Sequence, residues 1–232
     1  MKQKLTLLSV VLSFFFSCTN AETGTETTKE ATPAANGKAY LSTRFIGGLD
    51  INWIYLGNDG TILYNPVNGI DPVNLAAEIA AAPKNVGTYK MGAKGLSITW
   101  KDGKKAEWPI ERQNGEISMI DGVLVSLQKG MPANYKLTGT YTARTFFAEL
   151  SSSSKITFLP DGKFKEASTG TVSTAQTGAT AEKEHSGTYT ITGNTLRLNY
   201  NTGKKYAALI AIMNMGSSKA LVLNTSYYPQ NK

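Results

Sequence analysis

The stretch GTYTITGNTLRLNYNTGKK, from Gly187 to Lys205, carries the clearest structural signal in the chain. Tyrosine, isoleucine and leucine recur at alternate positions on either side of its centre, with threonine, arginine and asparagine between them. A two-residue period with one apolar face is typical of antiparallel strands that are buried on one side. The break at TGNT (192–195) contains Gly and Asn, which tolerate a positive φ and favour a tight turn. The stretch therefore predicts a hairpin, with another turn at NTG (201–203).

The same pattern occurs earlier in the chain, as GTYKMGAKGLSITWKDGKK (87–105). An ungapped overlay of 87–108 on 187–208 gives seven identical residues in 22 positions, including Gly-Thr-Tyr at the start and Gly-Lys-Lys near the end. An aromatic strand and an Asp-Gly turn precede both copies, in WIYLGNDGTILY (53–64) and in ITFLPDGKFKEA (156–167). We interpret the chain as an internal duplication.

The outer flanks extend the correspondence. YLSTRFIGG, from Tyr40, parallels YKLTGTYTA, from Tyr135, and GVLVSL, from Gly122, parallels ALVLNT, from Ala220. The order of the segments is the same in both copies, which supports two complete repeats rather than one shared motif.

Each copy holds six or seven short strands joined by tight turns, which predicts an all-β fold of tandem antiparallel meanders. We place the first repeat at 40–133 and the second at 134–232. Each copy could close into a lipocalin-like small barrel, or both could contribute to one sandwich or to a larger barrel. Closure is favoured because it removes exposed strand edges.

The two copies differ most between the Asp-Gly hairpin and the Gly-Thr-Tyr strand. The first copy has an alanine-rich segment that predicts one short helix near 72–82, with Asp71 as N-cap, Pro72 in the first turn and Pro83 at the end. The second copy has a polar segment of low complexity, 168–186, for which we expect a loop.

A resemblance rests on these same residues. FLPDGKF (158–164), followed after a variable segment by SGTYTITGNTLRLNYNTG (186–203), resembles a pattern found in small bacterial envelope proteins. Such proteins are described as lipocalin-like or as uncharacterised lipoproteins. The resemblance implies duplicated lipocalin-like β repeats, and its motifs concern turns and strands rather than an activity.

The N-terminus predicts secretion and lipid attachment. A charged start with Lys2 and Lys4 and an apolar run to Phe16 are typical of a signal peptide, which we place at 1–17. Cys18, the only cysteine, follows it and resembles the lipidated cysteine of bacterial lipoproteins. An ordinary secretory signal with a chance cysteine is the alternative. We therefore expect an outer-membrane lipoprotein of a Gram-negative cell envelope.

A polar tether is expected to follow the lipidated cysteine. Residues 18–39 are rich in Thr, Glu and Ala and cannot bury enough apolar surface to order themselves. Removal of Lys2 and Lys4 with the signal lowers the net charge from +7 to +5. The remaining basic residues are scattered, so no nucleic-acid partner is predicted. The expected partners are the membrane, through the lipid anchor, and an unknown small ligand or envelope protein.

The acidic residues and the single histidine do not form a recognisable catalytic site. The one histidine, His185, is expected to be solvated in the polar loop, which leaves no multi-histidine metal site. Four aspartates precede glycine and are expected to shape turns, and three glutamates are expected on solvent-facing strand positions. These acids are Asp59, Asp102, Asp121, Asp161, Glu107, Glu111 and Glu149. We expect a protein without catalytic residues, metal or cofactor, and not an enzyme.

Aromatic residues are the most suggestive functional feature. In a small barrel some of them could line a pocket for an apolar or glycan ligand. The candidate lining residues are Trp53, Tyr55, Trp100, Trp108, Phe158 and Tyr200. The first functional hypothesis is therefore a non-catalytic ligand-binding protein. The alternative is a structural or interaction protein that presents the 72–82 helix and the 168–186 loop to a partner.

Overall fold

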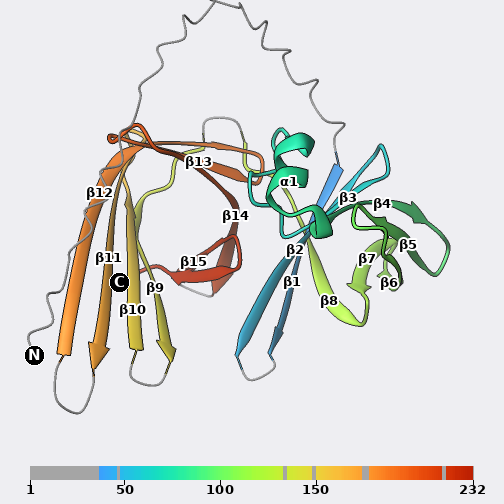
Figure 1. Cartoon of the computed structure of the whole chain (residues 1–232), viewed down its shortest axis with the longest axis horizontal. Helices are drawn as coiled ribbons and strands as arrows, with labels where there is room; N and C mark the ends of the chain where they lie inside the picture. The colour runs from blue at the N-terminus through green and yellow to red at the C-terminus, as the bar shows by residue number, and fades with distance from the viewer. Residues whose placement is uncertain are drawn as a thin grey trace, which may run out of the picture. The chain divides into compact units, whose positions relative to one another are not determined.

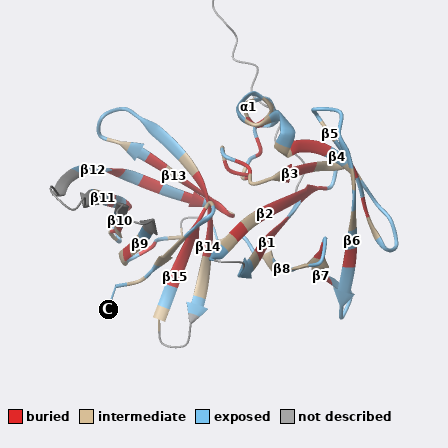
Figure 2. Cartoon of the chain, turned by 60° about the horizontal axis from the view of Figure 1, so that its bottom comes forward, coloured by how far each residue is buried: buried red, intermediate tan, exposed pale blue. Residues whose placement is uncertain are grey.

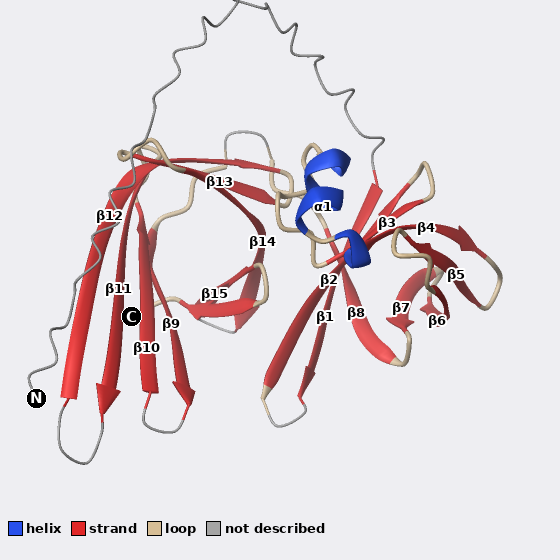
Figure 3. Ribbon diagram, viewed as in Figure 1, coloured by secondary structure: helices blue, strands red, loops and turns tan. Residues whose placement is uncertain are grey.

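The computed structural model describes residues 37–45, 48–132, 135–147, 150–173, 178–215 and 218–231 (Figure 1). The predicted signal peptide, Cys18 and all of the predicted tether except its last three residues lie outside this range, as does Glu149. The tether was expected to end at Ala39, but the first strand already begins at Gly37. Within the described residues the fold is all-β with one short α-helix, as Figure 3 shows.

The first repeat is a closed barrel of eight antiparallel strands in sequence order. Its first and last strands pair directly, from Ala39 opposite Gln128 to Ser42 opposite Val125. The strands are β1 (Gly37–Phe45), β2 (Leu49–Gly57), β3 (Thr61–Tyr64), β4 (Val86–Met91), β5 (Gly95–Trp100), β6 (Lys105–Gln113), β7 (Glu116–Ile120) and β8 (Val123–Gln128).

The second repeat is an eight-stranded antiparallel sheet, also in sequence order. Its edges meet at one isolated bridge between Tyr141 and Gln230, beside which the Asn231 amide donates to the Thr140 carbonyl at 2.8 Å. The sheet is therefore barrel-like, and we call it the second barrel. The strands are β9 (Gly139–Phe147), β10 (Leu150–Phe158), β11 (Lys163–Ser173), β12 (Gly178–Thr192), β13 (Thr195–Tyr200), β14 (Lys205–Met215), β15 (Ser218–Leu223) and β16 (Ser226–Pro229).

The internal repeat is confirmed down to individual hydrogen bonds. The hairpin predicted from Gly187 onward is β12–β13, and its counterpart is β4–β5 in the same register. In both copies the tyrosine of Gly-Thr-Tyr bonds through its amide to the glycine of the Asp-Gly turn, at 2.7 Å from Tyr89 and 2.8 Å from Tyr189. The Tyr89 hydroxyl donates to the Gly57 carbonyl at 3.0 Å, and that of Tyr189 lies 3.2 Å from the equivalent Leu159 carbonyl. The motif thus joins the fourth strand to the end of the second.

Several finer expectations were wrong. Each repeat has eight strands rather than six or seven. Pairing places Tyr40 at the position of Tyr141, not Tyr135, since both stand opposite the isoleucine of the following strand. The segment from Gly122 forms β8, whereas the segment from Ala220 lies in β15, the counterpart of β7.

The prediction of a polar loop at 168–186 is also wrong, because most of this segment forms strands β11 and β12. Ser168 pairs with Lys183 and Thr169 with Glu182 in the long β11–β12 hairpin. Threonine is favoured in strands, but a segment that is polar on both faces has no hydrophobic period to reveal it. His185 is exposed as expected, although it lies on β12 rather than in a loop.

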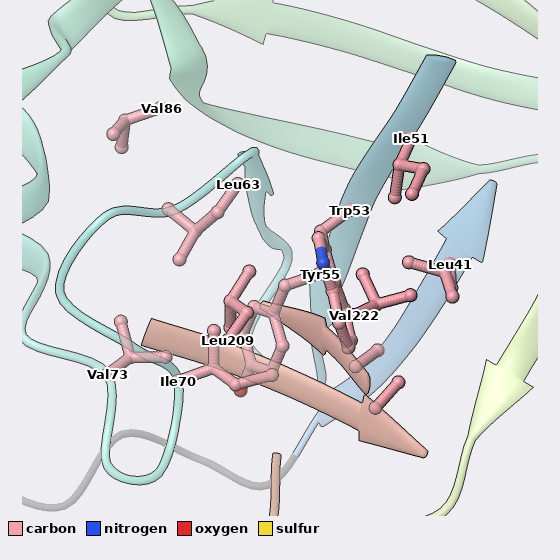
Figure 4. Packing of buried hydrophobic residues seen from close by; sticks show 12 residues of the cluster. Leu41, Ile51, Trp53, Tyr55, Leu63, Ile70, Val73, Val86, Leu209 and Val222 are labelled. Atoms are coloured by element: carbon pink, nitrogen blue, oxygen red, sulfur yellow. The ribbon is translucent and has the colours of Figure 1, made fainter. Parts of the chain in front are cut away.

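The buried apolar residues of the two barrels form three clusters. Neighbouring residues of a strand belong to different clusters because they point to opposite faces of the sheet. Inward residues such as Tyr40 and Ile54 fill the first barrel, and inward residues such as Phe158 and Tyr189 fill the second. The third cluster joins outward-facing residues of the two barrels with Ile70 and Val73 of the segment between β3 and β4 (Figure 4). We call it the inter-barrel cluster: Ala39, Leu41, Ile51, Trp53, Tyr55, Leu63, Ile70, Val73, Val86, Leu209, Ala211 and Val222. Buried residues accordingly follow one another along the second half of β2 instead of alternating with exposed ones (Figure 2).

The insertion between β3 and β4 carries the helix α1 (Leu75–Ala81) and the 3₁₀-helix η1 (Pro83–Asn85). The helix is shorter than expected and its N-cap is Asn74, whose side chain accepts from the Ala77 amide at 3.0 Å. Asp71 is not the cap. Inside the insertion the buried Glu78 carboxylate accepts from the Asn68 amide at 2.6 Å.

Asp71 instead joins the insertion to the second barrel. Its carboxylate accepts from the Asn194 amide at 2.7 Å, and the Thr195 hydroxyl accepts from the Asp71 amide at 3.0 Å. Burial raises the pKa of Asp71, while the bond from Asn194 acts in the opposite direction. Gly193 has φ of 56°, and a Cβ there would lie 2.5 Å from the Asp71 carboxylate, so only glycine fits. The insertion and the β12–β13 turn are therefore fitted to each other.

Among the described residues, no helix combines the length and the apolar character that crossing a membrane requires.

Candidate functional site

A cavity of about 370 Å³ opens on the inner side of the second barrel. It lies between β10, β13 and β14, where side chains at alternate positions face the barrel interior. Its floor is apolar and its rim is polar. The floor consists of Ile156, Leu196, Leu198, Ala208 and Leu223, and the rim includes Ser154, Glu166, Tyr200, Lys204, Tyr206, Asn224, Ser226 and Tyr228.

An alanine makes room for this cavity. Leu196 on β13 stands opposite Ala208 on β14, and the corresponding Leu96 of the first barrel stands opposite Trp108. The Trp108 ring packs inside the first barrel, with its centroid 5.7 Å from that of Trp100. The first barrel is thus filled by an indole at the position where the second has only a methyl group.

Two further positions differ in the same region. By strand pairing, Tyr64 of the first barrel corresponds to Glu166, and Trp100 corresponds to Tyr200. Tyr64 lies edge-on to Trp108 at 6.0 Å, so the first barrel contains a cluster of three aromatic rings. The second barrel has a carboxylate, a phenol and free space instead.

Glu166 and Tyr200 are bonded to each other. The Tyr200 hydroxyl donates to Glu166 Oε2 at 2.7 Å. Burial raises the pKa of Tyr200 far above its ordinary value, and the bond to Glu166 and the negative charge of that carboxylate raise it further. Tyr200 is therefore a neutral donor at physiological pH, and the carboxylate is its acceptor. The rings of Phe164 and His185 stand edge-on to Tyr200, at 5.1 and 5.9 Å.

Asn224, another residue of the rim, forms two side-chain hydrogen bonds. Its side-chain nitrogen donates to the Tyr206 hydroxyl at 2.8 Å, and its oxygen accepts from the Leu209 amide at 2.9 Å. Burial also raises the pKa of Tyr206. The Tyr228 hydroxyl lies 3.4 Å from the Ser154 hydroxyl. Three tyrosine side chains thus line the cavity, and two of them, Tyr200 and Tyr206, are fixed by hydrogen bonds of normal length.

Of the six aromatic residues predicted to line a pocket, only Tyr200 borders this cavity. Trp53 and Tyr55 lie in the inter-barrel cluster, and Trp53 Nε1 donates to the Asn224 carbonyl at 2.7 Å. Phe158 is buried in the second barrel, 5.0 Å from the ring of Tyr189. Trp100 and Trp108 are half-buried inside the first barrel.

A larger surface groove, of about 490 Å³, lies over β10–β12. Most of its lining side chains belong to the outer face of these strands and are polar or charged, among them Lys155, Lys165, Glu184 and Ser186. The inner cavity, in contrast, has a floor of buried core residues of the second barrel, so we take it as the candidate site.

The acidic residues mostly have the structural roles that the sequence predicts. The carboxylates of Asp59, Asp102 and Asp161 each accept from the backbone amide two residues later, at 2.9 to 3.1 Å. Asp121 has a positive φ of 52° in the turn before β8. Glu107 and Glu111 are exposed as expected. Over the described part of the chain, no group of three or more His, Cys, Asp or Glu side chains could hold a metal ion.

No family model, curated protein or solved structure matches the chain.

Proposed function

We propose that the protein is a non-catalytic binding protein whose second barrel holds a small ligand with an apolar body. The observation that carries this proposal is the inner cavity beside Ala208. Its volume of about 370 Å³ lies within the roughly 300–1,000 Å³ of ordinary ligand pockets. The apolar floor and the aromatic side chains at the rim are typical of such pockets, and the rim carries more polar groups than most. Between the apolar and glycan ligands expected from the sequence, the floor favours the apolar one.

The inner cavity favours ligand binding over the presentation of the 72–82 helix and the 168–186 segment to a partner. The insertion that carries the helix is already bonded to the second barrel through Asp71. Most of the 168–186 segment is paired as strand in β11 and β12. Both segments thus have roles within the chain.

Filling the cavity tests the proposed function. Ala208→Trp introduces the indole that fills the first barrel, and we expect at least about a tenfold loss of affinity for N-phenyl-1-naphthylamine, a neutral apolar fluorescent probe. Fluorescence titration measures this affinity. Overpacking can cost about 1–3 kcal/mol of stability, so folding is checked by circular dichroism and the milder Ala208→Leu is measured in parallel.

A matched control uses the adjacent alanine. Ala207 is half-buried on the opposite face of β14, so Ala207→Trp adds the same side chain outside the barrel. We expect probe affinity to change by less than about twofold in this variant, which corresponds to under roughly 0.5 kcal/mol. Equal binding by folded Ala208→Trp and wild-type protein would refute the proposed site.

We further propose that Cys18 carries a lipid that tethers the barrels to the bacterial cell envelope. Two acyl chains insert with about 0.8 kcal/mol per buried CH₂, enough for stable anchoring. Cys18→Ser is therefore expected to move the protein from the membrane fraction to the soluble fraction after cell lysis. Immunoblotting of both fractions measures the shift, with Ser17→Ala as the control. Firm membrane association of Cys18→Ser would contradict the lipid anchor.

A further inference from the structure

Among the described residues, Glu166 is a carboxylate without an ion-pair partner, placed on the rim of the inner cavity. It faces the barrel interior opposite Ile156, at the position where the first barrel has Tyr64. The ion pairs found in this part of the chain are Arg44–Asp50, Lys104–Asp102 and Lys163–Asp161, none of which involves Glu166. Glu166 is half-buried, so protein replaces part of the water around its carboxylate, and a cationic group of a ligand would offset that loss.

The carboxylate is oriented but not saturated. Tyr200 donates to Oε2 at 2.7 Å, and no hydrogen bond between described residues reaches Oε1. An ionised carboxylate can accept about four hydrogen bonds through its two oxygens. The bond from Tyr200 fixes the direction of the group, and the remaining lone pairs are available to a donor inside the cavity.

The rim around Glu166 is aromatic. The cavity lining includes Tyr200, Tyr206 and Tyr228, and the negative charge of Glu166 contributes to the raised pKa values of the first two. The face of a tyrosine ring attracts cations and adds to the attraction of a carboxylate. An anionic head group would be repelled here, and a neutral alcohol would gain only an uncharged hydrogen bond.

The charged or titratable groups nearest the cavity side of Glu166 include Lys204 and His185, while Lys155, Lys165 and Glu184 line the outer groove that Glu166 also borders. Lys204 lines the cavity from the β13–β14 turn but is exposed to solvent. His185 stands directly across from Glu166 in the β11–β12 pairing and is also exposed. Neither forms an ion pair with Glu166 within 4.0 Å. A ligand carboxylate would have to pair with Lys204, which gives the anionic ligand a distinct prediction.

We propose that the ligand of the second barrel carries a protonated amine, which the Glu166 carboxylate and the tyrosine rim bind while the apolar body lies on the cavity floor. The inference rests on the proposed function of this cavity and specifies the chemical class of its ligand. It assigns Glu166 as the specificity-determining residue and the apolar floor as the source of much of the affinity.

Three probes with the same alkyl chain test the inference: n-octylamine, n-octanol and octanoate, each titrated calorimetrically at pH 7. We expect octylamine to bind wild-type protein at least about tenfold more tightly than octanol, because charge-assisted hydrogen bonds are roughly twice as strong as neutral ones. Glu166→Gln keeps the shape and an acceptor for Tyr200 but removes the charge. It should abolish the preference for the amine and leave octanol affinity within about twofold.

Two further variants test whether another charged residue near the cavity causes the preference among the probes. Glu184→Gln removes an exposed carboxylate from the outer face of β12 and should leave the amine preference intact. Octanol binding without amine preference would overturn the inference and leave the proposed function standing. Tightest binding of octanoate, lost in Lys204→Ala, would also overturn it. Failure of all three probes to bind would overturn both the inference and the proposed function.

Discussion

Replacement of Trp53 by alanine is expected to lower the free energy of unfolding by about 3–5 kcal/mol. Trp53 is only 1% exposed and lies in the inter-barrel cluster, where it contacts side chains of both barrels (Figure 4). Its Nε1 also donates to the Asn224 carbonyl of the second barrel at 2.7 Å. The substitution removes both the packing and the bond between the barrels. Urea unfolding followed by circular dichroism measures the loss.

Two controls separate these contributions. Trp53→Phe keeps a large ring but removes the donor to Asn224, for which a loss of about 1–3 kcal/mol is expected. Phe45→Ala removes an aromatic ring that is 81% exposed and should change stability by less than about 0.5 kcal/mol. If Trp53→Ala were as mild as Phe45→Ala, the inter-barrel cluster could not be contributing to stability.

Gly187→Ala is expected to destabilise the protein by about 1–3 kcal/mol, the ordinary cost of forcing extra atoms into a packed core. A Cβ at Gly187 would lie 2.0 Å from the Asn199 carbonyl oxygen and 2.9 Å from a carbon of the Phe164 ring. The carbonyl belongs to the paired strand β13 and cannot turn away without breaking the hairpin. Thermal unfolding measures the effect, which should recur in Gly87→Ala, where the Thr99 carbonyl oxygen is 2.7 Å away.

Gly170 provides the opposite case on a neighbouring strand. It lies on β11, and a Cβ added there would meet no described atom within 4 Å, so Gly170→Ala restricts only the unfolded chain. That substitution should be neutral or should stabilise the protein by up to about 1 kcal/mol. Similar losses at Gly170 and Gly187 would show that close backbone approach is not the reason for glycine in the Gly-Thr-Tyr motif.

The hairpins were predictable because alternation and turn residues are local signals. In β12–β13 the apolar residues Tyr189, Ile191 and Leu198 fall on one face, and that face is the barrel interior. The inward face of strand β2 could not be predicted in the same way, because β2 is apolar on both faces. Trp53 was expected as a possible pocket residue, but its neighbour Ile54 faces the barrel interior and Trp53 faces the other barrel. A two-residue period cannot say which of two apolar faces points inward.

The candidate site was only partly predictable. The sequence predicts Tyr200 as a pocket residue because it is aromatic, whereas Glu166 and Ala208 carry no such signal. Ala208 matters because its side chain is only a methyl group, and neither composition nor periodicity shows that a small residue leaves a cavity. One signal was present in the sequence: the overlay of the two repeats ends with Trp108 above Ala208. A large-to-small difference at an inward position of duplicated barrels indicates that one interior is less filled than the other.

Because of the inter-barrel cluster, a single barrel of this chain is not expected to be a stable domain by itself. Repeated domains are often treated as modules that can be copied or removed one at a time. Here the outer face of β2 and the outer face of β14 and β15 cover each other, so a lone copy of either barrel would expose buried aliphatic and aromatic side chains to water. The duplication has produced two barrels that share a buried interface, so we expect a stable fragment to contain both copies.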